Sequence, residues 1–476
     1  MRSLRFPLGL SPPRKHIMIR PTTASVLLLA LGSLSAQTWT QLTPAPYPST
    51  LARRTGGIAY DLFQGSLLLY GGLQSGPTLT LNDTWKFDGT TWTQLTPATT
   101  PPPRWGHKMV FDSRRLRIVT FGGRSPTTTA NANDTWEWDG FDWIQMSPTA
   151  SPSARAFYGM AYDARRGKTI IYGLQSGAPN GNQTWEYDGT TWVQVTTSFV
   201  PPGLESPAMA YDQGRGVTVM FGGYNAVVPG TMYGNTWEYD GVDWVQRAPA
   251  TTPTPRYRAG MDYDSTRGRV VLYGGFGGGA LLDTWEYDGN NWTQVLTGGP
   301  AKSTEGYAAY LPTTRQFVYF GGSGPGGTNN ETWVYSGANT AIAAKFGQGC
   351  ATSAGVPDLA PTTLPQLGST YTLDLTNGAF SGIGLIAHGF SNLQWTLGNL
   401  PADLSTFGFG GCRLEVSLDT SLLAVLNSGA ASQSFTLPNN AAFANIQLYS
   451  QAMVLDATAP NGNGGMSNAV HGVFGN

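Results

Sequence analysis

The sequence predicts an all-β protein, in which a six-bladed β-propeller over residues 37–340 is followed by a smaller β-sandwich domain over residues 341–476. Three observations predict this fold class. A phrase of the type "DTWEYDGNNWTQV" recurs along the chain, with further strand-sized runs between its copies. The recurrence stops beyond Gly337, where different alternating runs begin. The chain holds 62 glycines, 32 prolines and only 12% charged residues, which favours short strands and tight turns over helices.

The repeated phrase predicts the number of blades. Its first tryptophan stands at Trp85, Trp136, Trp185, Trp237, Trp285 and Trp333. Two further apolar runs precede each copy, and the second usually ends in Gly-Gly, as in "LLLYGG". Four strand-sized runs at a period of about fifty residues are typical of a propeller blade rather than a solenoid repeat. Six copies therefore predict six blades.

The last copy is incomplete and predicts how the ring closes. It lacks the second tryptophan that the other five copies carry, whereas "TWTQLTP" at Thr38–Pro44 precedes the first copy without a blade of its own. We expect this segment to supply the outer strand of the sixth blade. Closure between the two ends of the propeller would leave no long exposed sheet edge.

These motifs resemble the kelch repeat, in which Gly-Gly follows an apolar strand and a tryptophan-bearing strand comes next. The resemblance covers about Trp39–Gly337 and implies a propeller, but no single function, because kelch propellers include enzymes, adaptors and carbohydrate-binding proteins. Beyond it, phrases such as "FGQGC" and "GFGGCRLEVS" resemble a C-terminal module of secreted bacterial proteins. That second resemblance implies no activity.

The first 36 residues have the layout of a secretory signal peptide. They contain five basic residues and no acidic one, and the apolar run "ASVLLLALGSLSA" ends in small residues. The run is too short to span a bilayer comfortably, although a retained anchor stays the alternative. Both Met1 and Met18 could be the start. We expect cleavage near Gln37, no transmembrane segment afterwards, and a secreted or envelope protein whose surface attachment stays open.

The cysteines and histidines limit the chemistry. Cys350 and Cys412 both follow the propeller, and an oxidising compartment permits a disulfide between them. A copper radical oxidase resembling galactose oxidase needs a tyrosine cross-linked to cysteine and two histidine ligands, whereas the propeller has no cysteine and only His107. We expect no metal site and no cofactor. The net charge of −1 argues against a nucleic-acid partner.

The candidate ligand site lies on the face that carries the variable loops. The loops after Gly-Gly and those leading into the next blade should share this face, opposite the Asp-Gly turns. A loop arginine recurs before the first strand of four blades, while Leu204 and Ser303 interrupt the pattern. The proposed ligand-binding residues are Arg53, Arg104, Trp105, His107, Arg155, Glu205, Arg256, Tyr257 and Arg258. Arginines beside aromatic rings suit bidentate and stacking contacts, but they could equally serve only to hold the loops in place.

Two classes of function remain. We favour an exported, monomeric, non-catalytic recognition protein that binds a protein or a glycan through the loop-bearing face. The alternative is a secreted carbohydrate-active enzyme that uses the same face or the channel mouth. No catalytic residue stands out, because the glutamates of the repeat recur with the blades. A rim of arginine and aromatic residues would indicate binding, whereas a mouth with two unpaired carboxylates would indicate catalysis.

Overall fold

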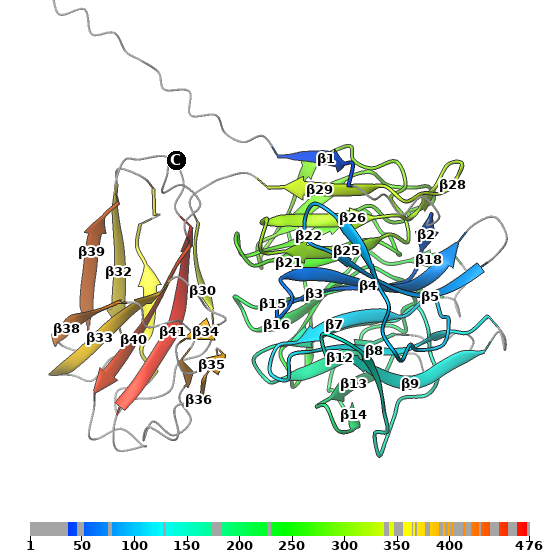
Figure 1. The fold of residues 1–476 in the computed structure, drawn as a ribbon. Coiled ribbons are helices and arrows are strands. Elements are labelled where there is room, and N and C mark those ends of the chain that lie inside the picture. The colour runs from blue at the N-terminus through cyan, green and yellow to red at the C-terminus, as the bar shows by residue number, and fades with distance from the viewer. Residues whose placement is uncertain are drawn as a thin grey trace, which may run out of the picture.

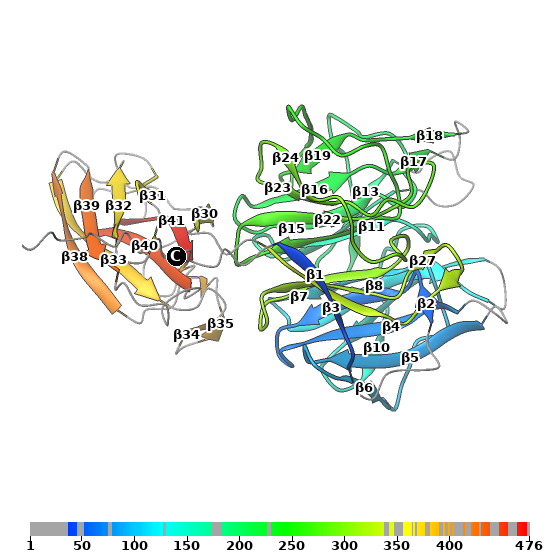
Figure 2. The same cartoon turned by 90° about the horizontal axis from the view of Figure 1, so that it is seen from above.

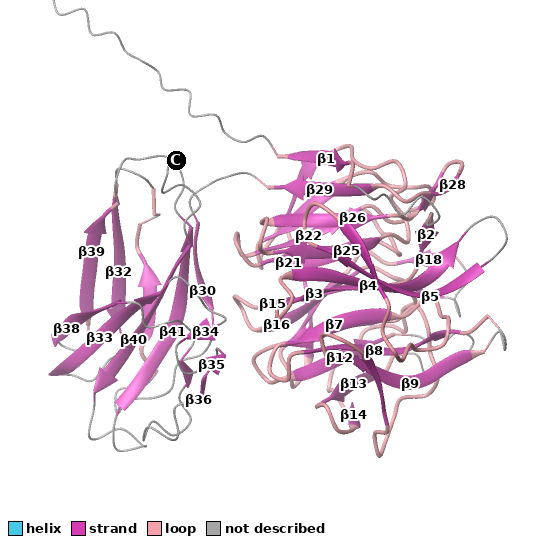
Figure 3. Cartoon of the chain, viewed as in Figure 1, coloured by secondary structure: helices cyan, strands magenta, loops and turns pink. Residues whose placement is uncertain are grey.

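The computed structural model describes residues 37–337, except 45–51, 75–78, 127–129, 174–181 and 226–229, and beyond residue 341 mainly the strands named below. Every regular element in the described residues is a β-strand (Figure 3). The expected signal peptide over residues 1–36 and both cysteines, Cys350 and Cys412, lie outside the described residues. The described part of the chain contains no helical segment with the length and hydropathy needed to span a bilayer.

Most described strands of residues 37–337 form six antiparallel sheets, which we number along the chain. Sheet 1 contains β3 (Gly57–Asp61), β4 (Ser66–Gln74), β5 (Leu79–Phe87) and β6 (Trp92–Leu95), with the short β2 (Arg53–Arg54) on β4. Sheet 2 contains β7 (Lys108–Asp112), β8 (Arg117–Arg124), β9 (Asn131–Trp138) and β10 (Trp143–Met146). Sheet 3 contains β11 (Gly159–Asp163), β12 (Lys168–Tyr172), β13 (Thr184–Tyr187) and β14 (Trp192–Val195).

The later sheets follow the same order with one exception. Sheet 4 contains β15 (Ala208–Asp212), β16 (Val217–Phe221), β19 (Thr236–Tyr239) and β20 (Trp244–Arg247). Sheet 5 contains β21 (Gly260–Asp264), β22 (Arg269–Tyr273), β23 (Thr284–Tyr287) and β24 (Trp292–Leu296). Sheet 6 contains β25 (Tyr307–Leu311), β26 (Gln316–Phe320) and β29 (Thr332–Ser336), and its fourth strand is β1 (Thr38–Leu42) from the other end of the chain. In this pairing, visible in Figure 1, Trp39 lies opposite Tyr335.

The first strands of the six sheets are neighbours in a closed series. β3 contacts β7, β7 contacts β11, and the series continues through β15, β21 and β25 back to β3. Figure 2 shows sheets 4 and 5, in green, opposite sheet 1, in blue. Four-stranded antiparallel sheets in this order are consistent with a kelch β-propeller.

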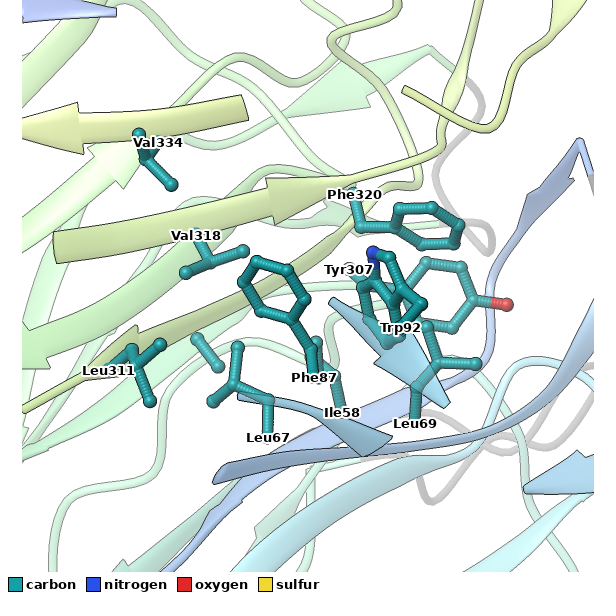
Figure 4. Packing of buried hydrophobic residues seen from close by; sticks show 11 residues of the cluster. Ile58, Leu67, Leu69, Phe87, Trp92, Tyr307, Leu311, Val318, Phe320 and Val334 are labelled. Atoms are coloured by element: carbon teal, nitrogen blue, oxygen red, sulfur yellow. The ribbon is translucent and has the colours of Figure 1, made fainter. Parts of the chain in front are cut away.

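Aromatic and aliphatic side chains fill the space between successive sheets. Between the first and the last sheet, Phe87 and Trp92 pack against Val318, Phe320 and Val334 (Figure 4). The Trp92 indole donates a hydrogen bond to Thr332 Oγ1 at 2.9 Å. Five further Trp–Thr bonds join neighbouring sheets, from Trp143 to Thr84, Trp192 to Thr135, Trp244 to Thr184, Trp292 to Thr236 and Trp39 to Thr284. The repeated phrase therefore recurs because its threonine and its second tryptophan connect each sheet to the next.

The sheets have two ends that differ in character. The short strands β2, β18 (Thr231–Met232) and β28 (Gly327–Thr328) lie at one end, on the right in Figure 1. β18 and β28 pair with β17 (Tyr224–Asn225) and β27 (Ser323–Gly324) in hairpins that follow Gly-Gly. The Asp-Gly turns lie at the opposite end. We call these two ends the loop face and the turn face.

Residues beyond 341 form two further sheets around one hydrophobic cluster. The larger sheet orders β30 (Ile342–Phe346), β41 (Gly464–Val473), β40 (Gln447–Leu455), β33 (Ser381–Gly389) and β38 (Thr420–Asn427). The smaller sheet orders β31 (Asp358–Pro361), β32 (Thr370–Thr376) and β39 (Ala431–Thr436). Leu373 and Leu375 of β32 share a buried cluster with Ile386 of β33 and Val454 of β40. Two short pairs complete the described strands, β34 (Gln394–Trp395) with β35 (Gly398–Asn399), and β36 (Ala402–Asp403) with β37 (Arg413–Leu414).

Candidate functional site

A cavity of about 610 Å³ runs between the first strands of the six sheets. Its lining is mostly apolar, and alanine and glycine alternate there with larger methionine and tyrosine side chains. Three charged residues depart from this pattern, Lys108 on β7, Asp262 on β21 and Arg315. Burial raises the pKa of Asp262 to about 6, although its carboxylate accepts backbone N–H bonds from Tyr310 and Tyr263. Burial likewise lowers the pKa of Lys108.

A ring of backbone hydrogen bonds surrounds the loop-face mouth of this channel. One residue just before the first strand of each sheet takes part: Thr55, Gly106, Phe157, Ser206, Arg258 and Glu305. Each N–H donates to the carbonyl of the preceding residue of the ring at 2.5–3.1 Å, and Thr55 donates to Glu305, so that the ring closes. The geometry needs a left-handed backbone at every position, with φ between 50° and 71°. Five of the six residues are not glycine, and such strain is retained where the surrounding structure enforces it.

Charged side chains from neighbouring sheets meet at this mouth. Arg258 Nη1 lies 2.6 Å from Glu305 Oε1, and Arg54 also pairs with Glu305. Arg258 Nη2 lies 3.8 Å from Glu205 Oε1. Burial raises the pKa of Glu205 and the Glu305 charge adds to this, while Arg258 opposes it. Both mouth glutamates thus face arginine.

Aromatic side chains surround the charged cluster. Trp105 and Phe157 contact edge to face with centroids 5.2 Å apart, and Tyr257 stacks on Tyr224 at 5.3 Å. Phe276, which is 37% exposed, contacts Tyr257 edge to face with centroids 5.7 Å apart. The Arg258 guanidinium lies 4.9 Å from the Tyr257 centroid and 5.9 Å from that of Phe157. We call Arg54, Trp105, Phe157, Glu205, Tyr224, Tyr257, Arg258, Phe276 and Glu305 the rim.

Backbone pairing places the aromatic residues together. In sheets 2, 4, 5 and 6 the residue after the loop arginine position forms a β-bridge with the residue after Gly-Gly, as Tyr257 does with Phe276. Glu205 is bridged to Tyr224 and Trp105 to Arg124 in the same way. The Arg124 guanidinium accordingly lies 5.5 Å from the Trp105 ring. The sequence analysis missed Arg54, Phe157, Tyr224 and Phe276 as rim residues. Their fixed place beside the loop arginine or Gly-Gly was the available signal.

The four loop arginines predicted to bind ligand lie beneath the rim, not on it. Arg53, Arg104, Arg155 and Arg256 are at most 2% exposed. Arg104 forms a two-pronged pair with Asp134 of its own sheet at 2.8 and 2.7 Å, and it donates to the Gly122 carbonyl. Arg53 and Arg256 pair in the same way with Asp83 and Asp283, while Arg155 binds the Gln183 side-chain oxygen. This geometry supports the alternative that these arginines hold the loops in place.

The remaining predicted site residues divide between the interior and the rim. His107 is 1% exposed, its Nε2 lies 3.2 Å from the Tyr70 carbonyl, and burial lowers its pKa to about 3. It is therefore a neutral interior residue. Trp105, Glu205, Tyr257 and Arg258 are partly exposed and lie together at the channel mouth.

Comparison with protein families identifies the repeat. Residues 57–248 match a family model described as the KLHDC2/KLHL20/DRC7 Kelch-repeats domain. The match extends over sheets 1 to 4. A search of curated proteins found no match. The family match and the all-strand architecture together support a kelch-repeat protein.

Proposed function

We propose that this chain is an exported recognition protein that binds a protein or a glycan through the rim of a closed six-bladed propeller, without catalysing a reaction. The kelch-repeat match suggests a protein-binding propeller. The six sheets, the closed contact series of their first strands and the pairing of β1 with β29 support the count of blades and the closure. The two sheets around one cluster beyond residue 341 support a β-sandwich there.

The observation that carries this function is the composition of the rim. Five aromatic rings and two arginines converge on one mouth, on loops fixed by a rigid ring of hydrogen bonds. Aromatic and arginine side chains held in this way are the residues that dominate recognition surfaces. Loops on a rigid scaffold are also where binding sites are usually found.

The pairing of the mouth carboxylates favours recognition over the enzymatic alternative. A hydrolase would need a carboxylate free to take or give a proton near the substrate. Glu305 instead forms ion pairs with Arg54 and Arg258, and Glu205 also faces Arg258. The carboxylates are thus used to orient Arg54 and Arg258 for contact with a ligand.

Two aromatic rim residues provide the test. Replacing Trp105 and Tyr257 together by alanine should weaken ligand binding by at least about 1 kcal/mol, since aromatic residues are frequent hot spots. The protein without residues 1–36 would be screened on a glycan array and against a library of extracytoplasmic proteins, and each ligand then titrated against both forms. Thr190→Ala on the turn face is the matched control. Ligands that bind the double variant and the wild type equally would contradict the rim as the binding surface.

Export is the second part of the proposal and is based on the signal-peptide layout of residues 1–36. Mass spectrometry of material exported by the native host should find a mature N-terminus within a few residues of Gln37. Exported protein that retains Met1 or Met18 would contradict it.

A further inference from the structure

On the turn face, an arginine fills the junction between most pairs of neighbouring sheets. Between sheets 2 and 3, Arg115 Nε donates to Asp112 Oδ2 at 2.7 Å, and Nη1 donates to both oxygens of Glu137 at 2.7 and 2.8 Å. Tyr187 of sheet 3 also donates to Glu137, and its ring centroid lies 5.5 Å from the guanidinium carbon. Aspartate, arginine, glutamate and tyrosine thus form one unit that spans two sheets.

The same unit recurs at the next three junctions. Between sheets 3 and 4 it consists of Asp163, Arg166, Glu186 and Tyr239. Between sheets 4 and 5 it consists of Asp212, Arg215, Glu238 and Tyr287. Between sheets 5 and 6 it consists of Asp264, Arg267, Glu286 and Tyr335. Between sheets 6 and 1, Leu311, Val334 and Phe87 occupy the aspartate, glutamate and tyrosine positions and pack together (Figure 4), and Thr314 stands at the arginine position. At these five junctions the protein's own side chains therefore fill the space between the sheets.

The junction between sheets 1 and 2 has neither the arginine unit nor the apolar packing of the other junctions. Asp61 keeps the aspartate position, but Gln64 replaces the arginine, Lys86 the glutamate and Trp138 the tyrosine. A cavity of about 250 Å³ lies here, lined by these four residues, by Leu95 and Pro97, and by Phe141 of the Asp-Gly turn. The shorter glutamine side chain, whose Nε2 donates to the Gly140 carbonyl, leaves the space that a guanidinium occupies elsewhere. We call this cavity the junction pocket.

The polar groups of the junction pocket do not use all of their hydrogen-bonding capacity within the protein. Asp61 Oδ1 accepts the backbone N–H groups of Phe63 and Gln64 at 2.9 and 3.1 Å, but no arginine reaches its second oxygen. The Trp138 indole and the Lys86 ammonium both face this carboxylate and oppose the rise in the Asp61 pKa that burial causes. Trp138 is only 2% exposed, and its Nε1–H makes no hydrogen bond of normal geometry within the described residues. The pocket therefore presents a carboxylate acceptor, an indole donor and the Lys86 ammonium donor. A buried donor without a full partner is costly, which favours a ligand that supplies one.

The entrance to the junction pocket is aromatic. Phe63 is 60% exposed and Phe141 is 71% exposed, and their centroids are 6.3 Å apart in an edge-to-face arrangement. At the junction between sheets 2 and 3, Thr190 stands in place of Phe141. Two exposed rings beside a polar cavity form an apolar surface that a ligand could cover.

We propose that the junction pocket binds a neutral saccharide residue. A sugar hydroxyl can donate to Asp61 and accept from Trp138 Nε1 and Lys86, while the C–H face of the ring packs on Phe63 and Phe141. The opposite charges of Asp61 and Lys86 favour a neutral ligand over a charged one. A guanidinium would face Lys86 where the other junctions offer glutamate, and an anion would face Asp61. The site lies on the opposite face from the rim, so it does not depend on the proposed function of the rim.

The test introduces into the junction pocket the side chains that fill the equivalent space at the other junctions. Saturation-transfer NMR and titration with glucose, galactose, mannose and N-acetylglucosamine would probe the wild-type protein without residues 1–36. Gln64→Arg combined with Lys86→Glu should abolish saccharide binding while the melting temperature is kept, because the two changes together restore the arginine and the glutamate of the other junctions. Asp61→Asn should weaken binding by about tenfold, as expected for loss of a hydrogen bond to a charged group. Phe141→Thr should also weaken binding, and Thr190→Ala is the matched control on the next turn.

Several outcomes would overturn the proposal. Absence of binding for all four sugars would do so, as would binding that the Gln64→Arg, Lys86→Glu double variant leaves unchanged. N-acetylarginine amide is the competing probe. If it binds in an Asp61-dependent manner while the sugars do not, the junction pocket takes a guanidinium instead. A rim double variant, Trp105→Ala with Tyr257→Ala, should leave saccharide binding at the pocket intact, which keeps the two sites distinguishable.

Discussion

At the scale of single residues, the repeats show which side chains depend on one another. Arginine at the loop position occurs with aspartate or glutamine at the start of the third strand, as in Arg104 and Asp134. In sheet 4, leucine and asparagine occupy these two positions, at Leu204 and Asn235. Within the described residues the Trp237 indole there has no hydrogen-bond partner, whereas Trp136 donates to Asp134. Sheet 4 thus lacks the arginine and the acid together, whereas sheet 3 keeps the arginine with Gln183 and sheet 6 keeps Glu331 with Ser303.

This dependence predicts a stability cycle. Arg104→Leu should destabilise the fold by about 3 kcal/mol, because it leaves the carboxylate of Asp134 without its cation in a partly buried place. Arg104→Leu with Asp134→Asn reproduces the combination of sheet 4 and should recover most of that loss. Urea unfolding of the two variants and the wild type measures the cycle. A double variant as unstable as the single one would show that the two residues act separately.

At the scale of elements, the N-terminal strand takes the place of a missing tryptophan strand. β1 pairs with β29 over Thr38–Leu42, and the Trp39 indole donates to Thr284 of sheet 5 as the second tryptophans do elsewhere. The Trp39 ring also lies 4.5 Å from Tyr273 and 5.6 Å from Tyr335. A five-residue strand thus covers both an open sheet edge and an aromatic cluster.

Deleting Thr38–Pro44 should therefore lower the melting temperature and promote aggregation. The deletion exposes the backbone edge of β29 and the rings that Trp39 covers, and such edges associate with one another. Differential scanning calorimetry and light scattering measure the two effects. Removal of residues 1–36 alone, which keeps β1, is the control. Equal stability of both truncated forms would mean that sheet 6 does not need β1.

At the scale of the whole molecule, the six first strands enclose a channel with an isolated carboxylate. Asp262 has a pKa raised by burial from its ordinary 3.8 to about 6. Between these two pH values the folded protein binds more protons at this site than the unfolded chain does. Stability should consequently fall as the pH rises through this range, because the folded state must then carry a buried charge.

Asp262→Asn removes this titration. The difference in melting temperature between variant and wild type should shift in favour of the variant as the pH is raised from about 4 to 7. Thermal unfolding at several pH values measures the difference, and Asp243→Asn on an exposed turn is the control. Parallel curves for Asp262→Asn and the wild type would show that the channel carboxylate is well solvated.

The sequence by itself determined the all-β class and the kelch-type repeat, because both depend on local spacing. Strand runs, Gly-Gly turns and the tryptophan phrase all lie within a few dozen residues of each other, and the same side chains recur at each sheet. The prediction that Thr38–Pro44 forms an outer strand was also within reach, since a missing tryptophan and a surplus one are both visible in the letters. The β-sandwich, the signal peptide and the disulfide stay predictions.

Only the tertiary structure decided which of the predicted site residues are buried and which lie at the channel mouth. Loop position suggested Arg104 and Arg256, but burial depends on Asp134 and Asp283, which approach them across the sheet from the third strand. Trp105, Tyr257 and Arg258 lie at one mouth together with Phe157 and Phe276, because ring closure and β-bridges bring different sheets together there. The junction pocket has the same origin. Gln64, Lys86 and Trp138 are unremarkable in the sequence, and they form a cavity only because two sheets place them against each other.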